Sequence, residues 1–278
     1  MSPRSSRSRC AARAGPPEHA VTGPEALSPA LIAYVVLVIA VAGWIQGALG
    51  LGFPMIATPL IAAATSMQIA VVMVLIPCLA TVFVSIARSA GSLDMLKRFW
   101  WMGLVALAGA AVGAKLFVLY PGFPYALLLA GVILFYLNLD RLGLSQWPLM
   151  QRHELAFGLL FGVLGGLCES TANIAAPPLI IYYLGIGLQP LLLVPAMNIS
   201  FLVGKSTQLA TLLPSGIASA GDWLFTLPLA VVATLASWQG AKLRHRIDGE
   251  TYRRWLRALL LVMALVLLGR AALQWLQS

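Results

Sequence analysis

Two charged side chains stand within otherwise apolar stretches of the sequence, and their types suit chemistry. Glu169 is the acid deep in an apolar block, and Lys205 is the clearest cation in one. A charge at the centre of a membrane helix costs about 2.5–3.5 kcal/mol on insertion scales, so each implies a cavity, a partner or a proton. Glu169 is a candidate for proton coupling or gating, with a structural hydrogen bond as the alternative. Lys205 suits contact with a small oxyanion, with an ion pair to Glu169 that neutralises both charges as the alternative.

Polar side chains near these two charges are candidates for binding the same anion. Asn198, Lys205 and Gln208 are spaced by seven and three residues, which places them on roughly one face of a helix. Hydroxyls and amides also follow Glu169 directly, and Gln46 and Thr58 could supply matching donors from the first half of the chain. The predicted binding set is Gln46, Gly50, Gly52, Thr58, Ser170, Thr171, Asn173, Asn198, Lys205 and Gln208.

Glycines and prolines interrupt two apolar stretches, one in each half of the chain. In lipid, backbone groups released by such residues must find partners, so a broken helix persists where it is packed or lines a cavity. Paired interruptions in corresponding places of two halves indicate a transporter's binding site, while close helix packing through small residues is the alternative. The predicted helix breaks are Gly47, Pro54, Pro59, Gly165, Gly166, Pro177 and Pro178.

The composition places the chain in a membrane. Apolar residues make up 60% of it and charged residues 10%, with a mean hydropathy of +0.89. Soluble domains contain about 45–50% apolar and about 25% charged residues. The net charge of +9 is concentrated in the amino-terminal tail and in loops, which indicates membrane topology and headgroup contact rather than nucleic-acid binding. We therefore predict an all-α, polytopic membrane protein whose partner is the lipid bilayer.

Catalytic and cofactor signatures are missing from the sequence. The three histidines lie in the tail or at linkers, and no HExxH or acid-rich pair occurs, so an intramembrane enzyme is disfavoured. Gly204-Lys205-Ser206 is not a phosphate-binding loop, because the required upstream glycine position holds Ile199. Three cysteines without a CxxC pair predict neither a disulfide framework nor a metal site. We expect no cofactor and no metal.

The apolar segments divide the chain into two similar halves. We predict a disordered basic tail over 1–28, a first transmembrane repeat over 29–140, a linker over 141–154 and a second repeat over 155–278. Each repeat is predicted to hold four helices, about eight in all, with the first one broken. The landmarks of this duplication are Gly43, Gly47 and Gly50 matched to Gly158, Gly162 and Gly165, and Gly113-Ala-Lys-Leu matched to Gly240-Ala-Lys-Leu.

The orientation of the two halves stays open at this stage. Simple alternation places the tail, the loop 88–98 and the linker on one side of the membrane. If the halves instead had opposite orientations, the basic loops 88–98 and 242–257 could both face the cytoplasm, as the positive-inside rule prefers.

The order of these motifs resembles the sulfite exporter TauE/SafE family over about residues 28 to 273. The run from Gly43 to Leu60 is similar to that family's glycine-rich opening, which ends in Pro-Leu. The segment from Pro177 to Tyr182 is similar to its Pro-Pro-Leu-x-x-Tyr sequence. This resemblance implies a carrier of sulfur-containing anions in the bacterial inner membrane, usually for export. Cys168-Glu169-Ser170-Thr171 departs from the family's second glycine-rich run, which leaves substrate and coupling open.

We therefore expect a multi-pass secondary transporter that exports a small inorganic or organic anion, such as sulfite or an organosulfonate, by alternating access. Each negative charge that leaves the cell gains about 2.3 kcal/mol per 100 mV of membrane potential, which favours export. An anion channel or a membrane assembly subunit without carrier activity is the alternative. A homodimer is the candidate assembly.

Overall fold

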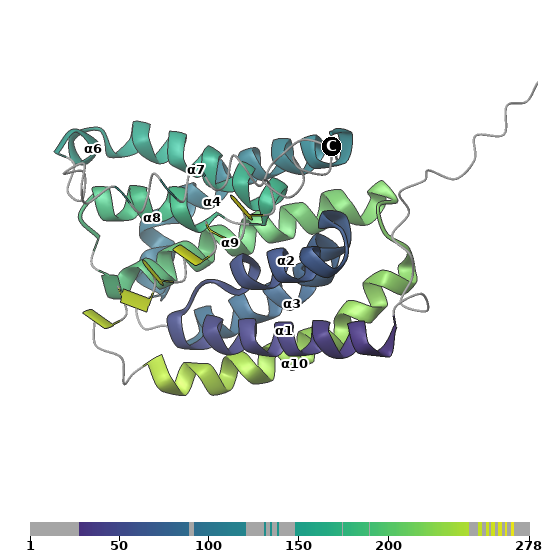
Figure 1. Ribbon diagram of the computed structural model, residues 1–278. Helices are drawn as coiled ribbons and strands as arrows, with labels where there is room; N and C mark the ends of the chain where they lie inside the picture. Colours follow the sequence, from purple (N-terminus) through teal and green to yellow (C-terminus); the bar gives the residue numbers. More distant parts are fainter. Residues whose placement is uncertain are drawn as a thin grey trace, which may run out of the picture.

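The protein was analysed as a computed structural model that describes residues 28–88, 92–120, 148–173, 175–188 and 190–244, with isolated positions within 131–138 and 250–269. In these described residues the chain is helical and contains no strand (Figure 1). Five of their helices are long and apolar enough to cross a membrane: Pro29–Leu49, Met67–Arg88, Asp94–Leu119, Glu154–Thr171 and Ala220–Leu243. The predicted all-α membrane class is thereby confirmed. The tail up to residue 27, and most of the segments predicted as the last helix of each half, lie outside the described residues.

The first predicted broken helix is a helical hairpin. α1 (Pro29–Leu49) begins at Ser28, whose hydroxyl accepts a hydrogen bond from Leu31 N. α2 (Phe53–Ala64) then runs back along α1. Its start is held at the end of α1 by a bond from Phe53 N to Gln46 Oε1, and its later part reaches the start of α1, where Tyr34 Oη donates to the Leu60 carbonyl at 3.0 Å. α2 therefore returns toward the side from which α1 set out.

The second half contains a hairpin of the same kind. α7 (Glu154–Ala172) is followed by α8 (Ala176–Gly185). α8 runs back along α7, because Leu179 packs at Gly165 and Tyr182 packs at Gly158. The short helix α6 (Pro148–Arg152) precedes α7 inside the predicted linker.

Four further long helices complete the described bundle. α3 (Met67–Arg88) and α4 (Ser92–Leu119) follow the first hairpin, and α9 (Pro190–Leu212) follows the second. A 3-10 turn, η2 (Leu213–Ser215), leads toward α10 (Ala220–Arg244). α9 packs against α3, α4, α7 and α8, so it links the two halves (Figure 1).

The long helices of the two halves pair reciprocally. α1 packs along α10, and α4 packs along α7. Glycines permit both contacts: a Cβ on Gly47 would lie 2.0 Å from the Ser237 carbonyl oxygen, and a Cβ on Gly166 would lie 2.1 Å from the Ala106 oxygen. The two matched Gly-Ala-Lys-Leu segments lie in the same pair of interfaces, since Gly240 faces Trp44 and Gly113 faces Leu167.

These contacts fix the directions of the helices. Along the α1–α10 interface residue numbers rise together, with Gly43 at Ala233 and Gly47 at Ser237. The end of α3 lies beside the end of α10, because the Arg88 guanidinium is 5.3 Å from the centre of the Trp238 ring. α4 begins close to that point in the chain, and α7 begins beside α4.

Two contacts show that α7 begins beside the start of α4. Trp101 packs at Gly158, and the Arg98 and Glu154 side chains form an ion pair at 3.7 Å. One end of the bundle therefore collects the ends of α1, α3 and α10 and the starts of α4 and α7. It follows that α1 and α7 run in opposite directions (Figure 1).

Basic residues gather at this end of the bundle, which we call the basic end. Its described members are Arg88, Lys97, Arg98, Arg152 and Lys242. Ser28 lies at the opposite end, so the simple alternation that placed residue 28 beside the loop 88–98 is wrong. The physical reason is the α1–α2 hairpin, whose short return lets α1 and α3 cross in the same direction.

Candidate functional site

The first hairpin breaks between Gly50 and Gly52. Gly50 (φ 79°) and Gly52 (φ 110°) adopt the left-handed conformation that side chains disfavour. Gln46 spans the break, since its Nε2 donates to the Gly50 carbonyl at 3.2 Å and its Oε1 accepts from Phe53 N at 3.0 Å. Pro54 follows in the first turn of α2, where its missing N–H costs nothing. The interruption between α1 and α2 therefore lies at Gly50 and Gly52, with the predicted break residue Pro54 directly after it.

Two of the predicted breaks in this half are wrong. Gly47 lies inside α1 and does not interrupt it. Its lack of a side chain instead allows the close contact with the Ser237 backbone in α10. Pro59 lies inside α2, where the helix continues through it.

The second hairpin breaks between its two predicted pairs of break residues, Gly165–Gly166 and Pro177–Pro178. Gly165 and Gly166, predicted as breaks, lie inside α7, which continues to Ala172. These glycines accommodate the Leu179 side chain and the α4 backbone at Ala106, so packing explains them. The turn occurs instead at Asn173, whose φ is 62°. Asparagine tolerates this conformation better than most residues do. Pro177 and Pro178 then stand in the first turn of α8, beside the true break.

Glu169 has the role at the second break that Gln46 has at the first. Its Oε2 accepts a hydrogen bond from Ala175 N at 3.0 Å, just before α8 begins. Its other oxygen, Oε1, forms an ion pair with Lys205 Nζ at 2.8 Å. Both side chains are buried: Glu169 is 2% exposed and Lys205 is 0% exposed.

Lys205 is surrounded by acceptors from α7, from the turn directly after α7 and from its own helix, α9. Besides Glu169, its ammonium donates to Asn173 Oδ1 at a short distance and to Gln208 Oε1 at 2.9 Å. Gln208 in turn donates from Nε2 to the Ser170 carbonyl at 3.1 Å. The network therefore includes polar groups as well as the ion pair, and its two charges sum to zero.

The two hairpins touch each other through the same network. Asn173 Nδ2 donates to Thr58 Oγ1 at 3.0 Å, which links the second break to the middle of α2. Asn198 contacts the first break, since its Nδ2 donates to the Gly50 carbonyl at 3.2 Å and to Ser85 Oγ at 2.8 Å. α9 thus contacts one break with Asn198 and the other with Lys205.

Most of the predicted binding residues meet at these two breaks. The residues brought together are Gln46, Gly50, Gly52, Thr58, Asn173, Asn198, Lys205 and Gln208. Ser170 joins through its carbonyl oxygen, while its buried hydroxyl has no hydrogen-bond partner among the described residues. Thr171 does not join, because its hydroxyl donates to Leu167 in the same helix. Sequence reasoning missed Ser85, which stands about one turn before Arg88 in α3.

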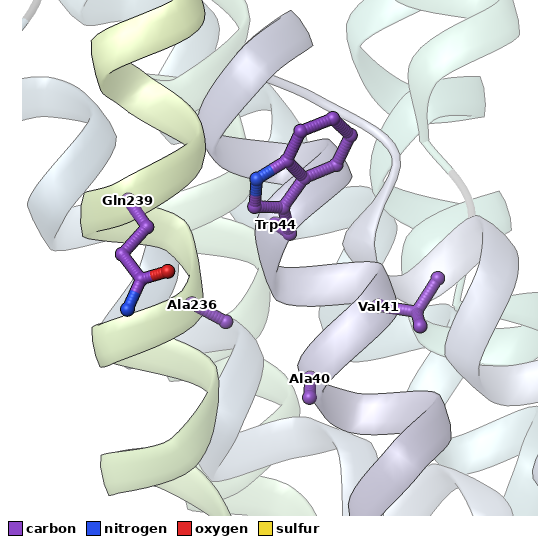
Figure 2. Close-up of a pocket in the computed structure, with 5 residues that line it drawn as sticks. All are labelled: Ala40, Val41, Trp44, Ala236 and Gln239. Carbon is purple, nitrogen blue, oxygen red and sulfur yellow. The ribbon is translucent and has the colours of Figure 1, made fainter.

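A groove on the outside of the bundle is separate from this network. It lies between α1 and α10 and is lined by Ala40, Val41, Trp44, Ala236 and Gln239 (Figure 2). Val41 and Trp44 are 46% and 41% exposed, so the groove faces the surroundings of the bundle. In the described residues, no group of three metal-ligating His, Cys, Asp or Glu side chains occurs.

A comparison with protein families supports the resemblance seen in the motifs. The family model described as "Sulfite exporter TauE/SafE" matches residues 35–267. No curated protein and no solved structure matches the chain.

Proposed function

The chain belongs to the sulfite exporter TauE/SafE family, and from this membership we propose that it is a secondary carrier that exports sulfite, an organosulfonate or a related sulfur-containing anion. Membership of this family suggests a membrane transporter of sulfur-containing anions. The proposal adds a site, a cycle and a direction.

The observation that carries the proposal is the buried Glu169–Lys205 pair at the contact between two broken helices. Desolvating two charges is costly, and well-packed apolar residues of similar size often serve stability equally well. A buried pair with further hydrogen bonds is therefore weak evidence for a purely structural role. Its place beside two interrupted helices is where transporters bind solutes.

The substrate would bind between the hairpins. Lys205 supplies the positive charge, and Asn173, Gln208 and Thr58 supply adjustable polar contacts. At the other break, Gln46, Asn198 and the Gly50–Gly52 backbone form the second part of the site. Ser170 contributes its unpartnered hydroxyl. In the described conformation the ammonium already contacts three protein oxygens, so binding requires this network to open.

Alternating access would come from movement of the two halves. The opposite directions of α1 and α7, and the exchange of partners in the α1–α10 and α4–α7 pairs, support two inverted repeats of one four-helix unit. Each hairpin would shield the bound anion from one side of the membrane. Glu169 is the coupling or gating residue in this proposal.

Charge supports the proposed orientation and direction, and the family resemblance supports the proposed location. The positive-inside rule favours the cytoplasm for the basic end, in the inner membrane of a bacterium. From there, the membrane potential drives export of each negative charge that is not balanced by a bound proton, at about 2.3 kcal/mol per charge per 100 mV. We keep the homodimer as a prediction.

Transport by the purified protein in liposomes tests the proposal. We expect saturable efflux of sulfite and of a small sulfonate, accelerated by the same anion on the other side, and a weaker response to a carboxylate. Flux that neither saturates nor shows counter-transport would indicate a channel instead. If none of these anions crosses with protein present, the carrier proposal fails and an assembly subunit becomes the better hypothesis.

A further inference from the structure

The Glu169 carboxylate occupies the position that a bound oxyanion would take. One oxygen accepts from Ala175 N at 3.0 Å, next to the start of α8, where a helix terminus favours negative charge. The other oxygen lies 2.8 Å from Lys205 Nζ. These are the two positive groups that the second half offers to an anion.

The first hairpin shows that closing such a break does not require a charge. There the neutral Gln46 makes the corresponding bond, from Phe53 N to its Oε1 at 3.0 Å. An amide at position 169 could make the same bond to Ala175 N. The negative charge of Glu169 therefore serves its contact with Lys205 and not the turn itself.

Charge balance limits what can happen when a substrate arrives. A monoanion on Lys205 beside an ionised Glu169 would leave two negative charges and one positive charge in a buried space, which is unfavourable. Among the described residues, two buried thiols interact electrostatically with this pair: Cys78 of α3 with both Glu169 and Lys205, and Cys168 of α7 with Glu169. Neither thiol offers a second cation, so a proton on Glu169 is the simplest source of balance.

The structure also gives the Glu169 side chain a small neighbour. Gly204 lies one residue before Lys205, and a Cβ there would come 3.2 Å from Glu169 Cγ. A larger residue at 204 would therefore press on the Glu169 side chain.

We infer that Glu169 is a tethered internal anion that competes with the substrate for Lys205 and the Ala175 N–H, and that it leaves them as the neutral acid. One proton from water then joins Glu169 for each monoanion bound, and the total charge of the site is conserved. This inference rests on the proposed function. It adds a defined coupling between the substrate and a proton.

Binding of methanesulfonate to the purified protein at several pH values tests this inference. A sulfonate stays ionised across the whole range, so any proton taken up belongs to the protein. Where Glu169 is ionised in the free protein, wild-type affinity should fall about tenfold per pH unit, and binding should take up one proton per anion. Glu169→Gln should bind without pH dependence and without proton uptake. The control is Glu154→Gln, which removes an exposed acid of the same helix and should retain the wild-type slope.

Several outcomes would overturn the inference. A Glu169→Gln protein that keeps the wild-type slope would do so, as would wild-type binding with no proton uptake at any pH. The second measurement needs no variant, so it decides the matter even if Glu169→Gln fails to fold. If wild type binds no sulfonate at all and transports none, the proposed function fails rather than the coupling alone.

Discussion

Asn173 Nδ2 donates a hydrogen bond to Thr58 Oγ1 at 3.0 Å, joining two hairpins whose residues lie 115 positions apart. The same amide accepts from Lys205 through its oxygen. One side chain thus connects the two hairpins with the buried cation. Its backbone is also the left-handed residue that ends α7.

The two roles of Asn173 can be separated by substitution. Asn173→Gly should keep the turn, because glycine adopts a positive φ readily, but it removes both side-chain hydrogen bonds. We expect a loss of about 1–3 kcal/mol in the free energy of unfolding and a large loss of anion flux. Asn173→Ala should be less stable than Asn173→Gly by about 1–2 kcal/mol, since alanine opposes the left-handed conformation. Denaturant unfolding in detergent would show the order, and equal stabilities would contradict the turn's role.

Removing one partner of the buried ion pair should destabilise the protein more than removing both. Lys205→Met leaves Glu169 buried beside no cation, which we expect to cost about 3–5 kcal/mol of unfolding free energy. The double variant Lys205→Met/Glu169→Gln should recover much of that loss, because no unpaired charge remains. Neither variant should transport an anion. A double variant that is stable and transports at the wild-type rate would show that the pair has a structural role alone.

The glycines of α1 should matter through packing. Gly47→Ala would place a Cβ 2.0 Å from the Ser237 carbonyl oxygen, which cannot relax without separating α1 from α10. Overpacking of this kind costs about 1–3 kcal/mol, so the melting temperature should fall. The control is Gly221→Ala in the first turn of α10, whose nearest neighbour would be 3.6 Å away. That variant should match wild type or exceed it slightly, and a similar loss in both would count against the close contact.

The basic end should face the cytoplasm. In a background with Cys10, Cys78 and Cys168 replaced by serine, single cysteines can be placed at Lys97 near the start of α4 and at Ser215 before α10. Both positions are exposed and lie at opposite ends of the bundle. An impermeant maleimide should label Ser215→Cys in intact bacterial cells and Lys97→Cys after permeabilisation. The reverse pattern would invert the proposed topology.

Composition predicted the membrane class, and an ion pair between Glu169 and Lys205 was one of two alternatives for these charges, because a charge in an apolar helix needs a partner. In the first half the break lies at Gly50 and Gly52, directly before the predicted break residue Pro54. In the second half it lies between the predicted pairs Gly165–Gly166 and Pro177–Pro178, and the two glycines serve helix packing instead. Glycine permits both a left-handed turn and a close helix contact. The sequence around a glycine does not show which of the two applies, because the contact partner in α4 is distant in the chain.

Long-range partners explain the other differences. The α1–α2 return depends on Tyr34 reaching Leu60 and on Gln46 reaching Phe53. Ser85 joins the network through Asn198, 113 residues away. None of these contacts leaves a local pattern in the sequence. The sequence could therefore offer opposite directions of the two halves only as one of two alternatives.

A structure of the protein with a bound sulfonate tests the central claim most directly. We predict sulfonate oxygens on Lys205 Nζ and on the Ala175 N–H, with the Glu169 side chain turned away from both. A sulfonate bound elsewhere, with the Glu169–Lys205 contact still at about its present 2.8 Å, would contradict the claim.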